Sequence, residues 1–189
     1  MMQTLTPCRI HAAAFASALS GLALLVVAGC ASPPAAVPVP PALAAPAGER
    51  AAFSHHAVGV QIYRCAAGAA GAAPSWAFVA PQAQLFADAG SREVLGSHGA
   101  GPFWQAQDGS RVTGQVKARA DAPQAGAIPW LLLATTPTNA AGLMAPVTHI
   151  QRVSTVSGVA PAAGCAAAAD VGQEVRVPYT ATYVYFVRS

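Results

Sequence analysis

Charged side chains are scarce in this sequence. Asp, Glu, Lys and Arg make up only 9% of its 189 residues, and Lys117 is the single lysine among ten basic residues. The formal net charge is +3, and no basic stretch is concentrated enough to form the footprint of a nucleic-acid-binding protein. We therefore expect no nucleic acid among the partners of this protein.

Motifs of several large enzyme classes are also missing. The chain has no Gly-x-Ser-x-Gly, no His-Glu-x-x-His and no phosphate-binding loop. Its Cys and His residues do not follow the spacing of a zinc site. A paired-acid glycosidase needs two carboxylates across a cleft, and nothing in the spacing of the acidic residues supports such a pair. These absences favour a binding or structural module, with no cofactor and no metal, over an enzyme.

No segment shows the sustained 3.6-residue period of an amphipathic helix. Gly and Pro number 17 and 16, which favours turns and short strands. We predict an all-β domain over residues 49–189, a compact antiparallel sandwich or barrel, with one short helical turn at most in 165–171. The segments with strand-like alternation, or with a short apolar run, are 57–65, 76–88, 128–135, 147–155 and 174–188.

Alternation and proline place further limits on these strands. In 57–65 the β-branched residues alternate with Gln61 and Tyr63, so the two sets face opposite sides of a strand. Pro81 is expected to break the second segment into two short strands. Pro178 is expected to split the last segment or to occupy an edge or a bulge, because proline cannot donate a ladder hydrogen bond.

An Asp-Gly pair predicts a β-hairpin in the middle of the chain. A loop of residues 108–110 would pair Gln107 with Arg111 and would place Trp104 opposite Gly114. A tryptophan opposite a cross-strand glycine is a favourable arrangement, because the indole fills the space that glycine leaves.

The N-terminus has the features of an export signal. Residues 1–29 combine a short basic region, an apolar run and small residues, and "VAGC" at 27–30 resembles the bacterial lipoprotein motif. The resemblance implies lipidation of Cys30. It also implies an outer-membrane location facing the periplasm, because Ser32 stands where aspartate is the usual retention signal. An ordinary secretory signal and an uncleaved anchor are the alternatives.

A proline-rich segment follows the predicted lipidation site. Residues 30–48 contain six prolines and are expected to form an extended tether that reaches roughly 55 Å from the membrane. Two cysteines, Cys65 and Cys165, remain in the predicted domain. In an oxidising compartment we predict that they form a disulfide, with two buried thiols or a metal site as alternatives.

Five residues are candidates for a ligand-binding site. They are His98, Trp104, Asp108, His149 and Arg152. A lone histidine is most often structural, and Asp108 is accounted for by its turn. The competing hypothesis is a metal-dependent or hydrolytic enzyme that uses His98, His149 and Asp108, and it requires these side chains to converge in space.

Several segments, in the same order along the chain, resemble a bacterial and fungal family known as domain of unknown function 3455. The family pattern usually has a tyrosine after the histidine and a threonine before the tryptophan, where this chain has Gly99 and Phe103. The resemblance implies a shared fold in an extracytoplasmic setting and carries no activity. The segments are "GVQIYRC" (59–65), "SHGAGPFWQAQDGS" (97–110), "AIPWLLL" (127–133), "VTHIQRVSTVSGVAP" (147–161) and "VPYTATYVYF" (177–186).

These observations together predict a lipid-anchored protein of the bacterial cell envelope. Its partners would be the membrane, through the lipid, and an unidentified ligand or protein of the envelope.

Overall fold

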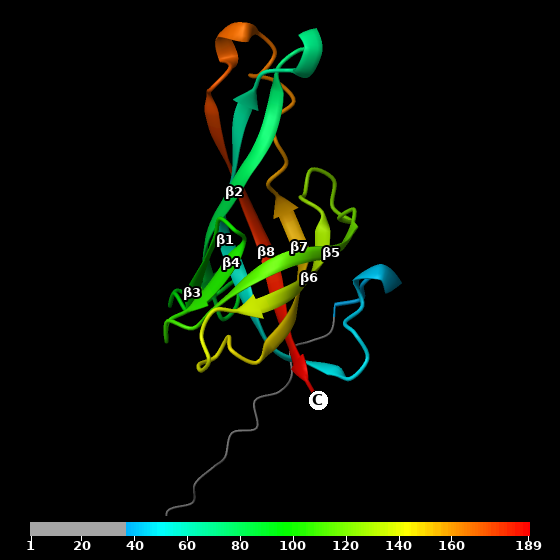
Figure 1. Ribbon diagram of the computed structural model, residues 1–189, viewed down its shortest axis with the longest axis vertical. Coiled ribbons are helices and arrows are strands. Elements are labelled where there is room, and N and C mark those ends of the chain that lie inside the picture. The colour runs from blue at the N-terminus through cyan, green and yellow to red at the C-terminus, as the bar shows by residue number, and fades with distance from the viewer. Residues whose placement is uncertain (1–36) are drawn as a thin grey trace, which may run out of the picture. The chain divides into compact units, whose positions relative to one another are not determined.

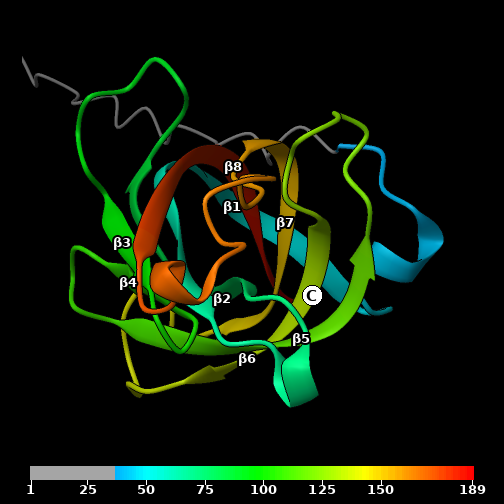
Figure 2. The same ribbon diagram turned by 90° about the horizontal axis from the view of Figure 1, so that it is seen from above.

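The computed structural model describes residues 37–189, and their strands form a closed antiparallel barrel (Figure 1). Each strand pairs with the next along the chain, and the last closes the ring against the first, as the view in Figure 2 shows. The all-β prediction is confirmed. The strands are β1 (Glu49–Ala66), β2 (Ser75–Phe86), β3 (Gly96–Gly99), β4 (Phe103–Ala106), β5 (Arg111–Ala120), β6 (Trp130–Pro137), β7 (Val147–Ser157) and β8 (Glu174–Arg188).

Helical structure in the described residues is limited to three single turns of 3-10 helix. They are η1 (Pro41–Leu43), η2 (Ala69–Gly71) and η3 (Ala168–Asp170). The last of these lies inside the segment for which a short helical turn was predicted. Within residues 37–189 no helix has the length and apolar character needed to cross a membrane.

The predicted disulfide joins Cys65 to Cys165, whose Cα atoms are 5.4 Å apart. Cys65 lies near the end of β1, and Cys165 lies in the long connection between β7 and β8. The main chain pairs on both sides of this bridge, because the N–H of Cys65 donates to the carbonyl of Gln173 and the N–H of Gly172 donates to the carbonyl of Cys65. The bridge therefore holds the β7–β8 connection against the end of the β1 strand.

A hydrophobic core occupies part of the interior of the barrel. Four of its side chains, Trp104, Tyr183, Tyr185 and Leu85, are almost completely buried. Further core residues from β5, β6, β7 and the loop before β7 pack around them, and these include Val112, Leu133, Met144, Val147 and Ile150. Aromatic side chains from β4 and β8 thus meet in the centre of the barrel.

The alternation in β1 is confirmed, and its valine face is the outer one. Val58 is 46% exposed, whereas Gln61 and Tyr63 point inward and are only 2% and 9% exposed. A polar amide and a phenol therefore occupy the interior where an aliphatic face would be the ordinary expectation.

The Asp-Gly hairpin forms, but its predicted register is wrong. Gln105, not Gln107, pairs with Arg111, and Trp104 pairs with Val112. The loop comprises residues 107–109, one position earlier than predicted, because the Ala106 N–H donates to the Ser110 carbonyl. Asp108 accepts hydrogen bonds from the N–H of Leu143 and from Ser110, and these bonds hold the loop in this position. The indole still covers Gly114, since a Cβ built there would lie 2.7 Å from Trp104 Cζ3.

A short arm, residues 37–48, packs on the outside of the barrel. Leu43 is completely buried, and the Gln151 amide donates a hydrogen bond of 2.6 Å to the Leu43 carbonyl. Trp130 and Leu132 of β6 form part of the apolar surface that this leucine contacts. This part of the predicted tether is therefore docked and contributes little to the reach of a spacer. The apolar residues at 37, 39 and 43 find a partner surface on the barrel, which a solvated polyproline segment would not have.

Replacement of Leu43 by alanine tests the docking of the arm. Because the side chain is fully buried against β6, β7 and β8, Leu43→Ala should lower the free energy of unfolding by about 2–5 kcal/mol in urea denaturation. The matched control is Leu143→Ala at a side chain that is 45% exposed, which should change stability by less than about 0.5 kcal/mol. Equal effects of the two substitutions would contradict the docked arm.

Candidate functional site

The barrel wall is interrupted between β2 and β5. The β3–β4 hairpin separates these strands, and it is too short to cover their full length. β3 pairs with β2 only at residues 83–85, and β4 pairs with β5 only at residues 111–113. Beyond the hairpin, residues 75–82 of β2 pair with β1 alone, and residues 115–120 of β5 pair with β6 alone. Two strand edges therefore face each other across a gap in the wall.

Pro81 lies in the stretch of β2 that pairs with β1 alone, and it does not break the strand. β2 runs without interruption from Ser75 to Phe86, which corrects the prediction of two short strands. The missing N–H of proline has no cost on a strand edge that lacks a neighbour. The position of Pro81 is thus consistent with a wall that is open on this side.

Apolar side chains surround the gap. Phe78, Val79 and Val116 are 55%, 46% and 52% exposed, although they belong to strands of a closed barrel. A cluster of exposed apolar residues at the mouth of a depression is typical of an interaction site.

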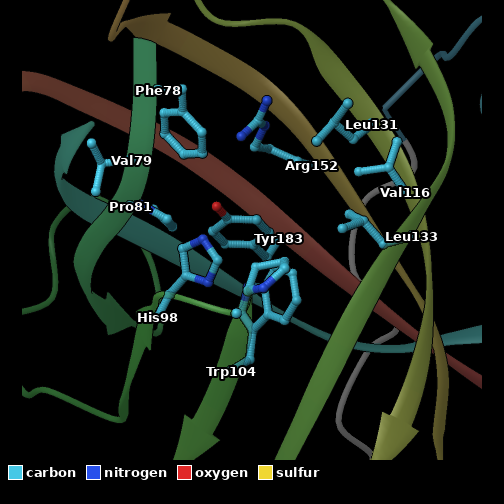
Figure 3. Close-up of a pocket in the computed structure, with 12 residues that line it drawn as sticks. Phe78, Val79, Pro81, His98, Trp104, Val116, Leu131, Leu133, Arg152 and Tyr183 are labelled. Atoms are coloured by element: carbon cyan, nitrogen blue, oxygen red, sulfur yellow. The ribbon is translucent and has the colours of Figure 1, made fainter. Parts of the chain in front are cut away.

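Behind the gap lies a cavity of about 380 Å³ that reaches into the barrel (Figure 3). A second cavity of about 460 Å³ adjoins it and shares Phe78, Val116, Leu131 and Arg152 with the first. Both volumes lie in the range of natural small-molecule sites. The pair of cavities, which we call the wall cavity, is therefore large enough for a ligand.

Three aromatic rings form the base of the wall cavity. The His98 imidazole stacks on the Trp104 indole at 4.4 Å with an interplanar angle of 19°. Tyr183 contacts both rings, with ring centroids 5.0 Å from His98 and 5.3 Å from Trp104. We call these residues the aromatic floor. They come from β3, β4 and β8, and they separate the wall cavity from the packed core.

His98 is neutral and its tautomer is defined by a hydrogen bond. Its Nδ1 lies 2.7 Å from the Phe103 carbonyl oxygen and must donate to it, since a carbonyl only accepts. Burial lowers the pKa of His98 to about 3, against the weaker opposing effect of this hydrogen bond. The second nitrogen, Nε2, lies on the cavity side of the ring (Figure 3) and can accept a hydrogen bond from a ligand.

Arg152 brings a cation into this otherwise apolar space. Its side chain extends from β7 between Phe78 and Leu131 (Figure 3). Nε and Nη2 donate to the Pro129 carbonyl at 3.1 and 2.8 Å, which fixes the plane of the guanidinium. Among the described residues no carboxylate forms an ion pair with it.

Two buried polar atoms beside the wall cavity have no hydrogen-bond partner in the described part of the chain. They are Nε1 of Trp104 and Nε2 of Gln61. Trp104 lines the first cavity and Gln61 lines the second. An unsatisfied buried donor costs about 1–3 kcal/mol, so these two atoms lower the stability of the fold at this place.

The remaining candidates have partners of their own. Asp108 belongs to its turn, where hydrogen bonds from Ser110 and from the Leu143 N–H lower the pKa of its carboxyl. His149 lies 2.9 Å from the Glu49 carboxylate. Neither residue lines the wall cavity. The structure therefore places His98, Trp104 and Arg152 around one cavity and leaves the two others outside it.

The described residues contain no group of three His, Cys, Asp or Glu side chains that are placed to hold a metal ion. Within residues 37–189, His98, His149 and Asp108 therefore do not form a shared metal site.

Sequence reasoning missed most residues of the wall cavity, among them Gln61, Phe78, Val116 and Leu131. Phe78, Val116 and Leu131 read as ordinary strand residues, and Gln61 read as the polar member of an alternating pair. The inward face of β1 was recognisable only as one of two possible faces. The position of Pro81 in a strand-like segment was the one signal of an open edge nearby.

The low pKa of the buried histidines predicts a dependence of stability on pH. Burial lowers the pKa of His98 to about 3 and that of His55 to about 4, whereas both take up a proton near pH 6.5 in the unfolded chain. The stabilisation is complete above about pH 6.5 and is lost as the pH falls toward the folded-state pKa values. Urea denaturation should show a loss on the order of 2–3 kcal/mol per histidine between about pH 6.5 and pH 4.5. In NMR spectra the His98 imidazole signals should stay constant down to about pH 4, and a transition near pH 6.5 would contradict its burial.

Comparison with known proteins gives one match. The family model described as "Protein of unknown function (DUF3455)" matches residues 46–187, which include the wall cavity and all eight strands except Arg188, the last residue of β8. Neither a curated protein nor a solved structure matches the chain.

Proposed function

The chain belongs to the DUF3455 family, and we propose that it is a lipid-anchored protein of the cell envelope whose barrel binds a small, mainly apolar ligand. The observation that carries the binding proposal is the wall cavity. It opens through a gap that the short β3–β4 hairpin leaves, and it is bordered by exposed apolar side chains.

The interior of the wall cavity supports the same conclusion. Most of its lining is aliphatic or aromatic, and a few polar groups converge on it, which is the usual composition of a ligand site. The polar groups of this lining include the neutral imidazole of His98 and the guanidinium of Arg152. The rigid aromatic floor gives an apolar ligand a preformed surface to rest on.

The envelope part of the proposal rests on the sequence. The "VAGC" motif at 27–30 lies outside the described residues, and a lipid on Cys30 would anchor the protein to the bilayer. The disulfide agrees with an oxidising compartment. The arm contacts the barrel from about residue 37 onward. The chain between Cys30 and residue 37 can therefore span at most about 25 Å. The barrel would therefore be held close to the membrane surface.

Binding of a neutral fluorophore tests the wall cavity. 1-Aminoanthracene should bind the purified domain with a blue-shifted, enhanced emission, because the cavity is apolar. Val116→Trp places a large ring in the exposed mouth and should weaken binding about tenfold or more, a loss of about 1.4 kcal/mol. The matched control is Val171→Trp, at a residue that is also exposed and lines neither cavity. No change in the emission of the fluorophore on addition of the wild-type protein would refute the proposed function.

Metabolic labelling tests the lipid anchor. The full chain, expressed in a bacterium with radiolabelled palmitate, should incorporate label and fractionate with membranes. Cys30→Ala should abolish both, whereas Cys8→Ala, inside the predicted signal, should abolish neither. Label that persists in the Cys30 variant would show that the anchor lies elsewhere.

A further inference from the structure

We propose that the ligand of the wall cavity is an anionic amphiphile, and that its carboxylate forms a bidentate ion pair with Arg152. This inference rests on the proposed binding function and adds the chemical class of the ligand. It follows from the charge of the cavity lining and from the hydrogen bonds that Arg152 makes and does not make.

The lining of the wall cavity is positively charged and contains no acid. Arg152 lies inside, and the exposed Arg119 lies at the mouth of the second cavity. No Asp or Glu belongs to either lining. His98 stays neutral above about pH 3, so it neither adds charge nor competes for an anion. The field in the cavity therefore favours a negatively charged ligand over a neutral or positive one.

Arg152 is positioned for such a ligand. A guanidinium has five N–H donors, and the two bonds to Pro129 use one donor on Nε and one on Nη2. The remaining donors, two on Nη1 and one on Nη2, lie at the end of the fork. This end matches the two oxygens of a carboxylate in a bidentate arrangement. Pro129 thus orients the cation, and the Tyr183 hydroxyl lies close enough to share one of the remaining donors. The other donors at the end of the fork are left for a ligand.

The surroundings of Arg152 favour the binding of an anionic counter-ion. Arg152 is half-buried among Phe78, Leu131 and Tyr183, where water screens its charge poorly. Its charge lowers the pKa of three nearby tyrosines, Tyr63, Tyr179 and Tyr183, against the stronger raising effect of their burial. These phenols remain neutral and cannot balance the cation. The balancing charge has to come from outside the described residues.

The apolar lining specifies the rest of the ligand. The body attached to the carboxylate would lie between the aromatic floor and the apolar rim formed by Phe78, Val79 and Val116. Head group and body are thus recognised by different sides of one cavity.

Competition with bound 1-aminoanthracene tests the inference. Decanoate, decanol and decylamine share one alkyl chain and differ in their head groups. Decanoate should displace the fluorophore from the wild-type protein at about tenfold lower concentration than decanol, or lower, because hydrogen bonds to charged groups are the stronger ones. Added salt should weaken the binding of decanoate but not that of decanol. Decylamine should be the weakest competitor of the fluorophore.

Two arginine variants show which residue causes the preference for decanoate. Arg152→Gln should bring the affinity for decanoate down to that for decanol. Arg188→Gln makes the same change in charge at an exposed residue that does not line the wall cavity, and it should keep the preference. If Arg152→Gln fails to fold, Arg152→Lys and the salt dependence of the wild type test the same point. Lysine keeps the charge and loses the fork, so part of the preference should remain.

The outcomes separate the two proposals. Equal displacement by decanoate and decanol in the wild type would overturn the carboxylate inference and leave the binding function standing. A preference for decanoate that survives Arg152→Gln would overturn the assignment to Arg152. Failure of 1-aminoanthracene and of all three alkyl compounds to bind would overturn the binding function itself and the inference with it.

Discussion

The shortness of the β3–β4 hairpin is the constraint on which the rest of the site depends. Each of its strands has four residues, whereas the flanking β2 and β5 have twelve and ten. A barrel whose strands were all of similar length would have no edge along its wall. Here the flanking strands extend beyond the hairpin, so two edges remain, and the gap between them gives access to the interior. Pro81 and the exposed Phe78 occupy the β2 edge.

The contacts that stabilise the barrel lie away from its open side. The packed core lies below the aromatic floor, and the Trp104 indole closes over Gly114 between core and cavity. The disulfide fixes the β7–β8 connection, and the arm covers the outer face of β6, β7 and β8. None of these contacts depends on the wall cavity being filled. The fold can therefore tolerate unsatisfied donors at that place, each at a cost of about 1–3 kcal/mol.

The sequence allowed the fold class and the hairpin to be predicted, because both depend on local residue chemistry. The disulfide could be predicted because only two cysteines remain in the domain. It did not allow the register of the hairpin to be predicted, because the position of the three-residue loop is fixed by a contact between Asp108 and Leu143, 35 residues away. Trp104 still meets Gly114, now as a diagonal neighbour, because a long indole reaches across more than one register. Alternation in β1 likewise defined two faces without showing that Gln61 faces inward.

The site was harder to predict because its polar groups belong to segments whose sequence shows only the alternation of a β-strand. Arg152 occupies an alternating strand next to Gln151, and the two side chains point to opposite sides of β7. Gln151 binds the arm through the Leu43 carbonyl on the outside, whereas Arg152 binds the Pro129 carbonyl on the inside. Both hydrogen bonds fix polar side chains that would otherwise be costly to bury. One face of β7 thus binds the arm, which leads to the predicted lipid anchor, and the other face carries the cation of the cavity.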